Sequence, residues 1–489
     1  MIAALSNVSQ PIISASTEPA RLKPRYALAA LAAYVVLTAI VAVHHEPWRD
    51  EADPWLVARD ADAVTFIKRA SLGGTPELWH LMLVPLARGG APYETQKILH
   101  LCIATASVAL ILFRSPFPPL TKLAAAFSYY FAYEYAIIVR SYALSVLLLL
   151  AIATLHRRRL DRPLRYALAI ALLANTNAHS LFIAAFLGTL YAYEALQSRL
   201  LRSRLPAVAI MLLGGIVAAI QIECDTADRA LGFVRIQFMA PLDALGQAFL
   251  PMLDWRITPM FALLLAASAM WWLRSNTPLL AFLCLSYAAI ALILTFWWIG
   301  GLRHAGFFLV LLLMAIWIHL DSHRERDSPA VTRTGRIVLA LLTLSLLVSD
   351  VSTALIDLTD YRYAFSGAKD MAGFINSHGL GSQPLAGHSQ TTTSALAPYM
   401  KHPLWYPGIE EYGTFNLWDR KFDAGLNVTY PEAVKRAKRH FLGRRDFLIL
   451  LNVEIPNPAS EGLALVYATR VPVFEHLDER FWLYRPAPQ

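Results

Sequence analysis

The chain alternates long apolar runs with short polar links over about its first 355 residues. The first run extends from Tyr26 to Val43, and ten more follow at about 94–113, 118–137, 140–156, 164–178, 179–197, 205–222, 258–273, 277–299, 304–320 and 336–355. Most are close to the roughly 17–25 residues that an α-helix needs to cross a bilayer. The pattern predicts a polytopic α-helical membrane protein with about 11 transmembrane helices.

Basic residues directly precede the first apolar run, at Arg21, Lys23 and Arg25. Positive charge followed by an apolar run is also the signature of a cleaved signal peptide. Because the run is long and further spans follow it, we favour an uncleaved membrane anchor.

The composition agrees with a membrane protein. The 489 residues are 56% hydrophobic and 16% charged, with a mean hydropathy of +0.45, which is too apolar for an ordinary soluble protein. The net charge of +8 and the isoelectric point near 9.3 are values that nucleic-acid-binding proteins share. The basic residues fall in short links between apolar runs, as the positive-inside rule expects, so we expect no nucleic-acid partner.

The same links predict an orientation. If the N-terminus is cytoplasmic, the short basic clusters all fall on the cytoplasmic side, namely Arg114 with Lys122, Arg157 to Arg165, Arg199 to Arg204, Arg274, and Arg324 to Arg336. An odd number of spans then places the C-terminus outside. The sequence therefore predicts a multi-pass protein of the inner (plasma) membrane with a cytoplasmic N-terminus and an extracytoplasmic C-terminal part.

Two units follow from this pattern. Residues 1–355 form a transmembrane domain whose outer loops 44–93 and 223–257 are long, and residues 356–489 form a separate domain. In the first loop we expect interfacial helices. One has Asp53 as N-cap and Pro54 as its first residue and ends near Gly73 and Gly74, and a shorter one covers Pro76 to Ala87.

After Asp357 the apolar runs shorten, and Gly, Pro and charged residues become frequent. Periodicity predicts helices near 367–377, 391–400 and 431–442, and strands near 384–388, 446–454, 464–470 and 481–485. This indicates a small C-terminal α/β extracytoplasmic domain. Its aromatic-rich segment LWYPGIEEYGTFNLWDRKF suits either acceptor recognition or a structural core.

An acidic cluster carries the strongest chemical signal. The stretch HHEPWRDEADPWLVARD, from His44 to Asp60, places Asp50 and Glu51 directly after the first span. There, burial would raise a carboxyl pKa and a cation such as Arg49 or Arg59 would lower it, so either residue could serve as a base for an acceptor hydroxyl. The alternative is a solvated loop after a membrane anchor.

The segment WRDEADPWLVARD, followed by an interfacial helix, many spans and an outer C-terminal domain, resembles the GT-C-type glycosyltransferases. These include protein mannosyltransferases and aminoarabinose transferases. The resemblance implies a membrane glycosyltransferase that takes a sugar from a polyprenyl-phosphate donor. The sugar would be transferred, with inversion, to a glycan, lipid or protein acceptor outside. It further implies that Asp50 is the base and Glu51 its supporting neighbour, although their roles in this chain stay open because adjacent side chains point in different directions.

Two arginines are candidates for neutralising the departing phosphate. Arg140 lies in AYEYAIIVRSYALSV, after Glu134 and before Tyr142, and this segment resembles the Arg-Tyr signature of the family. Arg303 lies in WWIGGLRHAGFF, also at the outer end of a span, with His304 next to it. A headgroup contact for Arg140 and a local hydrogen-bonding role for His304 are the alternatives.

Two further histidines complete the predicted substrate site. His179 follows a polar turn and either lines the cavity or satisfies the turn backbone. His80 stands beside Trp79, which would either stack on a sugar or anchor the chain at the interface. The predicted substrate-binding residues are Arg59, His80, Arg140, Tyr142, His179, Arg303 and His304.

We expect no required cofactor. The three cysteines show no zinc or disulfide spacing. Glu223, Asp225 and Asp228 in the second outer loop offer oxygen ligands for a divalent metal, but a solvated loop is the favoured interpretation. Two rival functions remain: a transporter or flippase of lipid-linked sugars, which should show repeats and midplane charges, and a non-enzymatic assembly or sensor protein.

Overall fold

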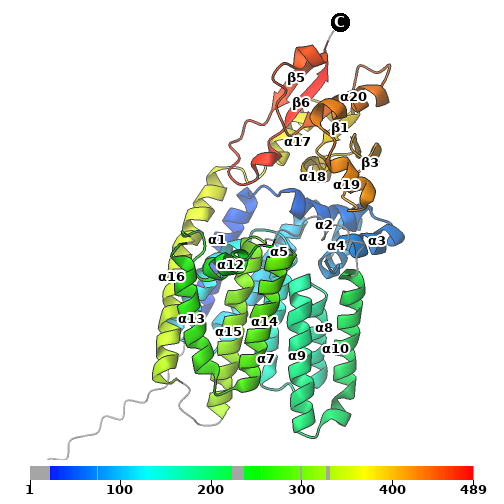
Figure 1. Cartoon of the computed structure of the whole chain (residues 1–489). Helices are drawn as coiled ribbons and strands as arrows, with labels where there is room; N and C mark the ends of the chain where they lie inside the picture. The colour runs from blue at the N-terminus through cyan, green and yellow to red at the C-terminus, as the bar shows by residue number, and fades with distance from the viewer. Residues whose placement is uncertain are drawn as a thin grey trace, which may run out of the picture.

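The computed structural model describes residues 22–73, 75–222, 236–254, 256–297, 300–325 and 331–487. Figure 1 shows a bundle of long helices with a small α/β domain at one end, which we call the domain end. A layer of shorter helices lies between the bundle and the domain. This layer is formed by the residues that follow the first long helix.

The bundle contains helices that are long and apolar enough to cross a membrane. Among the described residues there are six: α1 (Pro24–His44), α5 (Thr95–Arg114), α10 (Leu201–Ile222), α14 (Thr277–Phe296), α15 (Leu302–Glu325) and α16 (Arg333–Arg362). Beside them stand α7 (Tyr142–His156), α8 (Pro163–Ala174), α9 (Ala178–Gln197) and α13 (Thr258–Leu273). The protein is a multi-pass membrane protein, whereas the predicted count of 11 spans is not confirmed.

The segment 118–137, predicted to be one span, is broken. It forms α6 (Pro119–Phe127) and, after a break at Ser128, a short π-helix, η1 (Tyr130–Glu134). Hydroxyl groups of α16 satisfy the broken backbone, because Thr353 donates to the carbonyl of Phe127 and the amide of Tyr129 donates to Ser349. Non-helical backbone at membrane depth needs such partners, and they come from a helix more than 200 residues later in the chain.

The intermediate layer contains α2 (Arg49–Asp60), α3 (Ala63–Gly73) and α4 (Leu78–Arg88). The prediction of a helix beginning at Asp53 was wrong, since α2 begins at Arg49 and a break after Asp60 separates it from α3. The reason is a capping box, in which the Glu51 carboxylate accepts a hydrogen bond from the amide of Trp48 (3.2 Å). The described part of the second predicted loop contains an unforeseen helix, α12 (Ala240–Phe249).

The C-terminal domain is built on one six-stranded sheet. Its elements are α17 (Ala368–Ser377), η2 (Leu380–Ser382), β1 (Leu385–His388), α18 (Gln390–Thr393), η3 (Ser394–Tyr399), β2 (Leu404–Tyr406), β3 (Glu411–Gly413), α19 (Arg420–Leu426), α20 (Tyr430–His440), β4 (Leu448–Leu451), η4 (Pro458–Glu461), β5 (Leu463–Ala468), η5 (Leu477–Glu479) and β6 (Trp482–Pro486). The four predicted strands are confirmed as β1, β4, β5 and β6, whereas β2 and β3, three residues each, were missed.

The strand order is β3-β2-β1-β4-β6-β5, with β2, β1 and β4 parallel and the outer pairs antiparallel. The carboxyl end of β1 leads directly into α18 and η3, and both pack on α2. The edge of the sheet where the parallel strands end therefore faces the intermediate layer, as Figure 1 shows for β1, α18 and α2.

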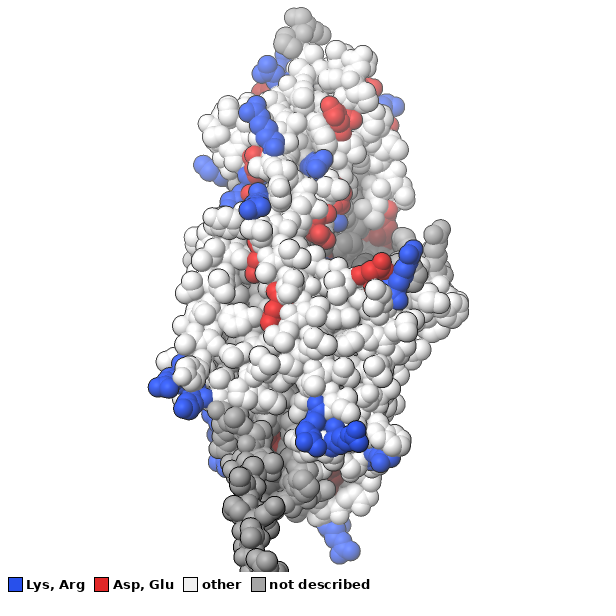
Figure 2. Space-filling model, turned by 90° about the vertical axis from the view of Figure 1, so that its left-hand side faces the viewer, with Lys and Arg blue, Asp and Glu red and all other residues white. Residues whose placement is uncertain are grey.

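Charge is distributed unevenly along the molecule. On the face that Figure 2 shows, a broad belt of the bundle is almost free of charged residues, and Lys and Arg lie beyond it, both at the far end of the bundle and on the C-terminal domain. An uncharged belt matches the hydrocarbon layer, and basic residues at the far end match a cytoplasmic surface. The cytoplasmic position of the far end stays a prediction.

Gly306 permits close packing in the core of the bundle. It lies on α15, most of which is buried, and a Cβ at this position would overlap the hydroxyl of Tyr135 and the ring of Tyr130. The absent side chain brings α15 against η1 and the turn that follows it. Arg303 lies in the first turn of α15, and the turn after η1 leads to Arg140.

We expect Gly306→Ala to lower the free energy of unfolding by about 1–3 kcal/mol, because overpacking a filled core forces side chains and backbone to shift. The measurement is the thermal unfolding midpoint of the purified protein in detergent. Gly215→Ala on α10 is the matched control, since no atom lies within 4 Å of a Cβ added there. Equal midpoints for Gly306→Ala and wild type would contradict the close packing of α15 on η1.

Candidate active site

Asp50 lies in the first turn of α2, at the domain end of the bundle, and is held between two arginines. Its Oδ2 atom is 2.5 Å from Nη1 of Arg140 and 3.5 Å from Nη2 of Arg303. The side chains of all three residues remain between 22% and 28% exposed. The structure therefore brings together the three residues on which the sequence-based site prediction depended, and it leaves them accessible.

A proline strengthens the link between Asp50 and Arg140. Pro54 lies inside α2 and has no amide hydrogen, so the carbonyl oxygen of Asp50, four residues earlier, has no helical donor. Nη1 of Arg140 donates a hydrogen bond to this oxygen at 3.1 Å. Arg140 thus binds both the backbone and the side chain of Asp50, which fixes the guanidinium group at the start of the helix.

The electrostatic environment keeps Asp50 ionised. Burial alone would raise the pKa of this carboxyl, but Arg140, Arg303 and Arg49 outweigh it and lower the pKa below its ordinary value. In this state Asp50 is a carboxylate that is neutralised by guanidinium groups. Its basicity depends on whether these groups stay with it or move to another anion.

Glu51 has a different environment from its neighbour. Its side chain is completely buried, and it accepts hydrogen bonds from the amide of Val139 (2.7 Å), from the amide of Trp48 (3.2 Å) and from Nε2 of His45 (3.0 Å). Burial would raise its pKa, yet His45 and these hydrogen bonds lower it. Glu51 therefore joins α2 to the segment before Arg140, and Asp50 is the accessible member of the pair.

His45 connects this carboxylate to the last long helix. Its Nδ1 atom lies 2.8 Å from Oδ2 of Asp360 on α16, and its Nε2 atom lies 3.0 Å from Oε2 of Glu51. All three side chains are fully buried. Burial would lower the pKa of His45, but Asp360 and Glu51 raise it to about 10. His45 is therefore an imidazolium that donates to both carboxylates.

Three further predicted residues gather on the Arg140 and Arg303 side. Nε2 of His304 donates to the hydroxyl of Tyr142 (2.9 Å), because its Nδ1 accepts a hydrogen bond from the amide of Gly301 (2.9 Å). The ring of His179 lies 5.0 Å from that of His304. Tyr142, His179 and His304 thus form one buried cluster, in which Tyr142 and His304 directly follow the segments that carry Arg140 and Arg303.

Arg59 and His80 lie apart from this site. Arg59 is at the opposite end of α2, where it forms an ion pair with Asp60 (2.7 Å) and lines a cavity of about 620 Å³. His80 pairs with Glu77. No contact found among the described residues joins either side chain to Asp50. Trp79 neither anchors the chain nor faces a sugar site, since it is 1% exposed and packs against His100.

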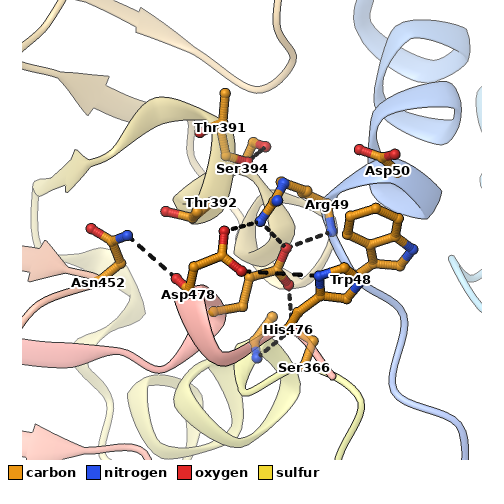
Figure 3. Close-up of polar contacts among 12 residues, drawn as sticks. Trp48, Arg49, Asp50, Ser366, Thr391, Thr392, Ser394, Asn452, His476 and Asp478 are labelled. Carbon is orange, nitrogen blue, oxygen red and sulfur yellow. Dashed lines mark hydrogen bonds and ion pairs between the residues drawn. The ribbon is translucent and has the colours of Figure 1, made fainter. Parts of the chain in front are cut away.

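The C-terminal domain contacts the start of α2. Nη1 of Arg49 lies 2.6 Å from Oδ2 of Asp478 and 3.1 Å from Oε1 of Glu479. The ring of Trp48 stacks on that of His476 at 3.7 Å. Figure 3 shows Arg49 turned toward the segment of Asp478, while the side chain of Asp50 points elsewhere. The residue before Asp50 is therefore held by the outer domain.

Sequence reasoning missed His45, Asp360 and the contacts of Trp48 and Arg49. The available signal for His45 was its place in the same acidic stretch, at the end of α1. For Asp360 the signal was a carboxylate at the end of the last long helix. Neither signal identifies the pairing, since the two residues are 315 positions apart.

Metal ligands are not clustered in the described part of the chain. No group of three or more His, Cys, Asp or Glu side chains there has a geometry suited to a metal ion. The carboxylates Glu223, Asp225 and Asp228 fall outside the described residues. The expectation that no metal is required stays a prediction.

Solved structures give the comparison with known proteins. The chain aligns over 96% of its length with ArnT from Cupriavidus metallidurans bound to undecaprenyl phosphate, at a TM-score of 0.58, 13% identity and full coverage of that chain. The apo state of the same ArnT aligns over 95% of the chain and 99% of ArnT, at a TM-score of 0.54 and 11% identity. The chain has a GT-C fold. No protein-family model matches it, and no curated protein matches it at a significant level.

The GT-C fold agrees with the resemblance inferred from WRDEADPWLVARD and with the arrangement of spans, interfacial helices and outer domain. At these identities the likeness shows the fold alone. The roles of Asp50, Arg140 and Arg303 must therefore be argued from their chemistry.

We expect His45→Gln to destabilise the protein by about 3–5 kcal/mol, because it leaves Glu51 and Asp360 buried without a cation. Folding raises the pKa of His45 from 6.5 to about 10. Its stabilising contribution is therefore complete below pH 6.5 and is lost as the pH rises through about 10. The difference between the thermal unfolding midpoints of wild type and variant should be largest at pH 6 and narrow toward pH 10.

The control is His44→Gln, which changes the neighbouring, exposed histidine. The unfolding midpoint of His44→Gln should differ from the wild-type value by only a small amount that does not change with pH. A gap for His45→Gln that is constant over this pH range would show that His45 is not a charged link.

Proposed function

We propose that this protein is a membrane glycosyltransferase that moves a sugar from a polyprenyl-phosphate-linked donor to an acceptor on the extracytoplasmic side, by a single inverting displacement. The observation that supports the proposal most strongly is the accessible Asp50 carboxylate between Arg140 and Arg303 at the domain end of a GT-C fold. This arrangement combines a base with cations that suit a departing phosphate. The ArnT structure with undecaprenyl phosphate supports a donor of this lipid class.

The proposed reaction forms one bond to the anomeric carbon of the donor sugar and breaks another. The acceptor oxygen forms a bond to the anomeric carbon and loses its proton to Oδ2 of Asp50. The bond between the anomeric carbon and the phosphate oxygen breaks, and its electron pair stays on the phosphate. One carboxylate base is sufficient for a displacement of this kind, since no covalent enzyme intermediate forms.

Competition for the arginines would activate the base. In the free protein, Arg140 and Arg303 lower the pKa of Asp50 and so weaken it as a base. A donor phosphate linked to both lipid and sugar carries one negative charge, which rises toward two as the sugar departs, and bidentate arginine contacts to phosphate are strong. As the arginines turn toward the phosphate, the pKa of Asp50 rises. The base would therefore become effective only when donor is bound.

Arg303 is the better placed of the two for this exchange. Its contact with Asp50 is 3.5 Å, longer than that of Arg140, and its Nε atom is buried with no hydrogen-bond partner in the described structure. The face of Trp48 lies 5.5 Å from its guanidinium carbon and holds the group by a cation–π contact. Tyr142 and His304 would support the same phosphate side of the site, and His179 would pack behind them.

The proposal includes the orientation predicted from the sequence. The domain end would be extracytoplasmic, the basic end cytoplasmic, and the membrane the inner (plasma) membrane. The donor lipid would reach the site from the bilayer, and the acceptor would arrive from the aqueous side. A single inverting transfer requires a base beside cations, whereas neither rival function, a transporter or an assembly protein, requires an accessible carboxylate between two arginines.

We expect Asp50→Asn to reduce sugar transfer by about 10²- to 10⁴-fold, the range that general-base catalysis supplies. The measurement is transfer of labelled sugar from a synthetic polyprenyl-phosphate donor at matched protein abundance. Asp446→Asn is a suitable control, because Asp446 is also paired with an arginine but lies in the exposed part of the outer domain. Transfer by Asp50→Asn at the wild-type rate would remove Asp50 from the mechanism.

We expect Arg303→Gln to raise the KM for the donor by about 10- to 150-fold, the equivalent of the 1.5–3 kcal/mol of a hydrogen bond to a charged group. The KM for the acceptor should change little. Steady-state kinetics with each substrate varied in turn tests this. Arg439→Gln, at an exposed ion-paired arginine of the outer domain, is the control. A defect confined to the acceptor would contradict the phosphate role.

A further inference from the structure

A cavity of about 620 Å³ lies between the intermediate layer and the C-terminal domain. One wall comes from the end of α2, with Arg59 and Asp60, and from Thr65 of α3. The other wall comes from the C-terminal domain, with Gln390 and residues around β3. This volume lies within the range of small-molecule sites, which favour boundaries between domains.

The cavity begins beside the point of the sheet where α/β domains bind ligands. The connection after β1 leads to β2 on one side, whereas β4, on the other side of β1, is followed by β6 and β5. The strand order thus reverses between β1 and β4, and ligands bind at the carboxyl ends of strands at such a switch point. Gln390 is the second residue after β1 and lines the cavity. Figure 3 shows neighbouring Thr391 and, directly after β4, Asn452, which lies on the other side of Asp478 from Arg49.

The charges of the lining indicate what kind of ligand fits. Besides His402 there are three basic and three acidic side chains, namely Arg59, Lys401 and Lys421 against Asp60, Glu411 and Asp419. Four of them form ion pairs within the lining, Arg59 with Asp60 and Lys421 with Glu411. A balanced lining would not select an anion. Adjacent donors and acceptors instead match hydroxyl groups, each of which donates and accepts.

An aromatic ring adds a stacking surface. Tyr412 on β3 lines the cavity and is 53% exposed, which is unusual for a strand residue of its size. The tyrosine is held in place by His440 of α20, whose ring lies 5.7 Å from the Tyr412 ring and whose Nε2 lies 3.3 Å from the Tyr412 hydroxyl. An exposed ring beside paired charges suits the C–H face of a sugar ring, whose hydroxyl groups then reach the polar side chains.

The distance between Asp50 and the cavity sets the minimum length of a ligand that contacts both. Arg59 stands nine positions after Asp50 on α2, which corresponds to about 13.5 Å along the helix axis. A single sugar at Asp50 cannot reach the cavity across this distance. A chain of sugars can, with its reactive hydroxyl at Asp50 and its more distant units beside Tyr412.

We propose that this cavity is a binding site for the uncharged saccharide chain of an extended acceptor, several units away from the hydroxyl that is glycosylated. The proposal rests on the proposed function, and it assigns the C-terminal domain to recognition of the acceptor. The polar side chains of α2 and the aromatic ring on β3 would contact the saccharide chain from two sides.

Binding can be measured without turnover. The full-length Asp50→Asn protein in detergent is applied to a panel of immobilised defined glycans of one to eight units, both neutral and anionic. We expect retention of neutral glycans of several units, with no binding of single sugars. Tyr412→Ala in this background should weaken the affinity about tenfold or more, and Tyr412→Phe should keep it because the ring remains.

Matched variants test the polar wall. Lys401→Ala should weaken binding, whereas Lys435→Ala, at an 80% exposed lysine outside the cavity, should not. Failure to retain any neutral glycan, retention of anionic glycans alone, or equal binding by Tyr412→Ala would overturn the inference. These results leave the transferase proposal intact if wild type still transfers sugar. Conversely, glycan binding without sugar transfer from any polyprenyl-phosphate donor would refute the proposed function and leave the cavity assignment standing.

Discussion

The structure of the site depends on one buried ionic link, in which the His45 imidazolium lies between the carboxylates of Glu51 and Asp360. Charges removed from water are costly unless each is paired and hydrogen-bonded. Here the positive group satisfies both negative ones, and Tyr133 donates a further hydrogen bond to Asp360. The link ties together the end of α1, the start of α2 and the end of α16. It fixes where α2 begins and so where Asp50 stands.

The adjacent carboxylates of Asp50 and Glu51 have different roles: Glu51 is structural, and Asp50 is the one proposed for chemistry. The Glu51 carboxylate accepts hydrogen bonds from two backbone amides and from His45. Protonation of Glu51 by a substrate would disrupt these contacts. Asp50 points to the accessible side, where the guanidinium groups of Arg140 and Arg303 rather than backbone groups neutralise it. Pro54 contributes to this division, since it releases the Asp50 carbonyl for Arg140. A single helical turn therefore holds both a buried structural carboxylate and an accessible carboxylate paired with arginines.

The sequence predicted what is local and missed what is distant. Apolar runs marked most long helices, and a carboxylate directly after the first span marked Asp50. The segments AYEYAIIVRSYALSV and WWIGGLRHAGFF, read with the family resemblance, added Arg140 and Arg303. The start of α2 was misplaced because Asp53-Pro54 is a typical helix start, whereas the true start depends on the cap made by Glu51. The link from His45 to Asp360 spans 315 residues, and the break at Ser128 is satisfied by α16, so neither has a local signal.

The placement of the outer domain follows from the same geometry. A base at the membrane surface can receive a lipid-borne donor from the bilayer, but a soluble acceptor arrives from water and needs a separate surface to orient it. The intermediate layer offers α2 as a common wall, with Asp50 at one end and Arg59 at the other. The carboxyl ends of the parallel strands β1 and β4 face this helix. Arg49, at the start of the helix, forms ion pairs with Asp478 and Glu479 of the domain. A shift of the domain would therefore move the start of α2, so the proposed recognition on the domain and the proposed chemistry at Asp50 would share one helix.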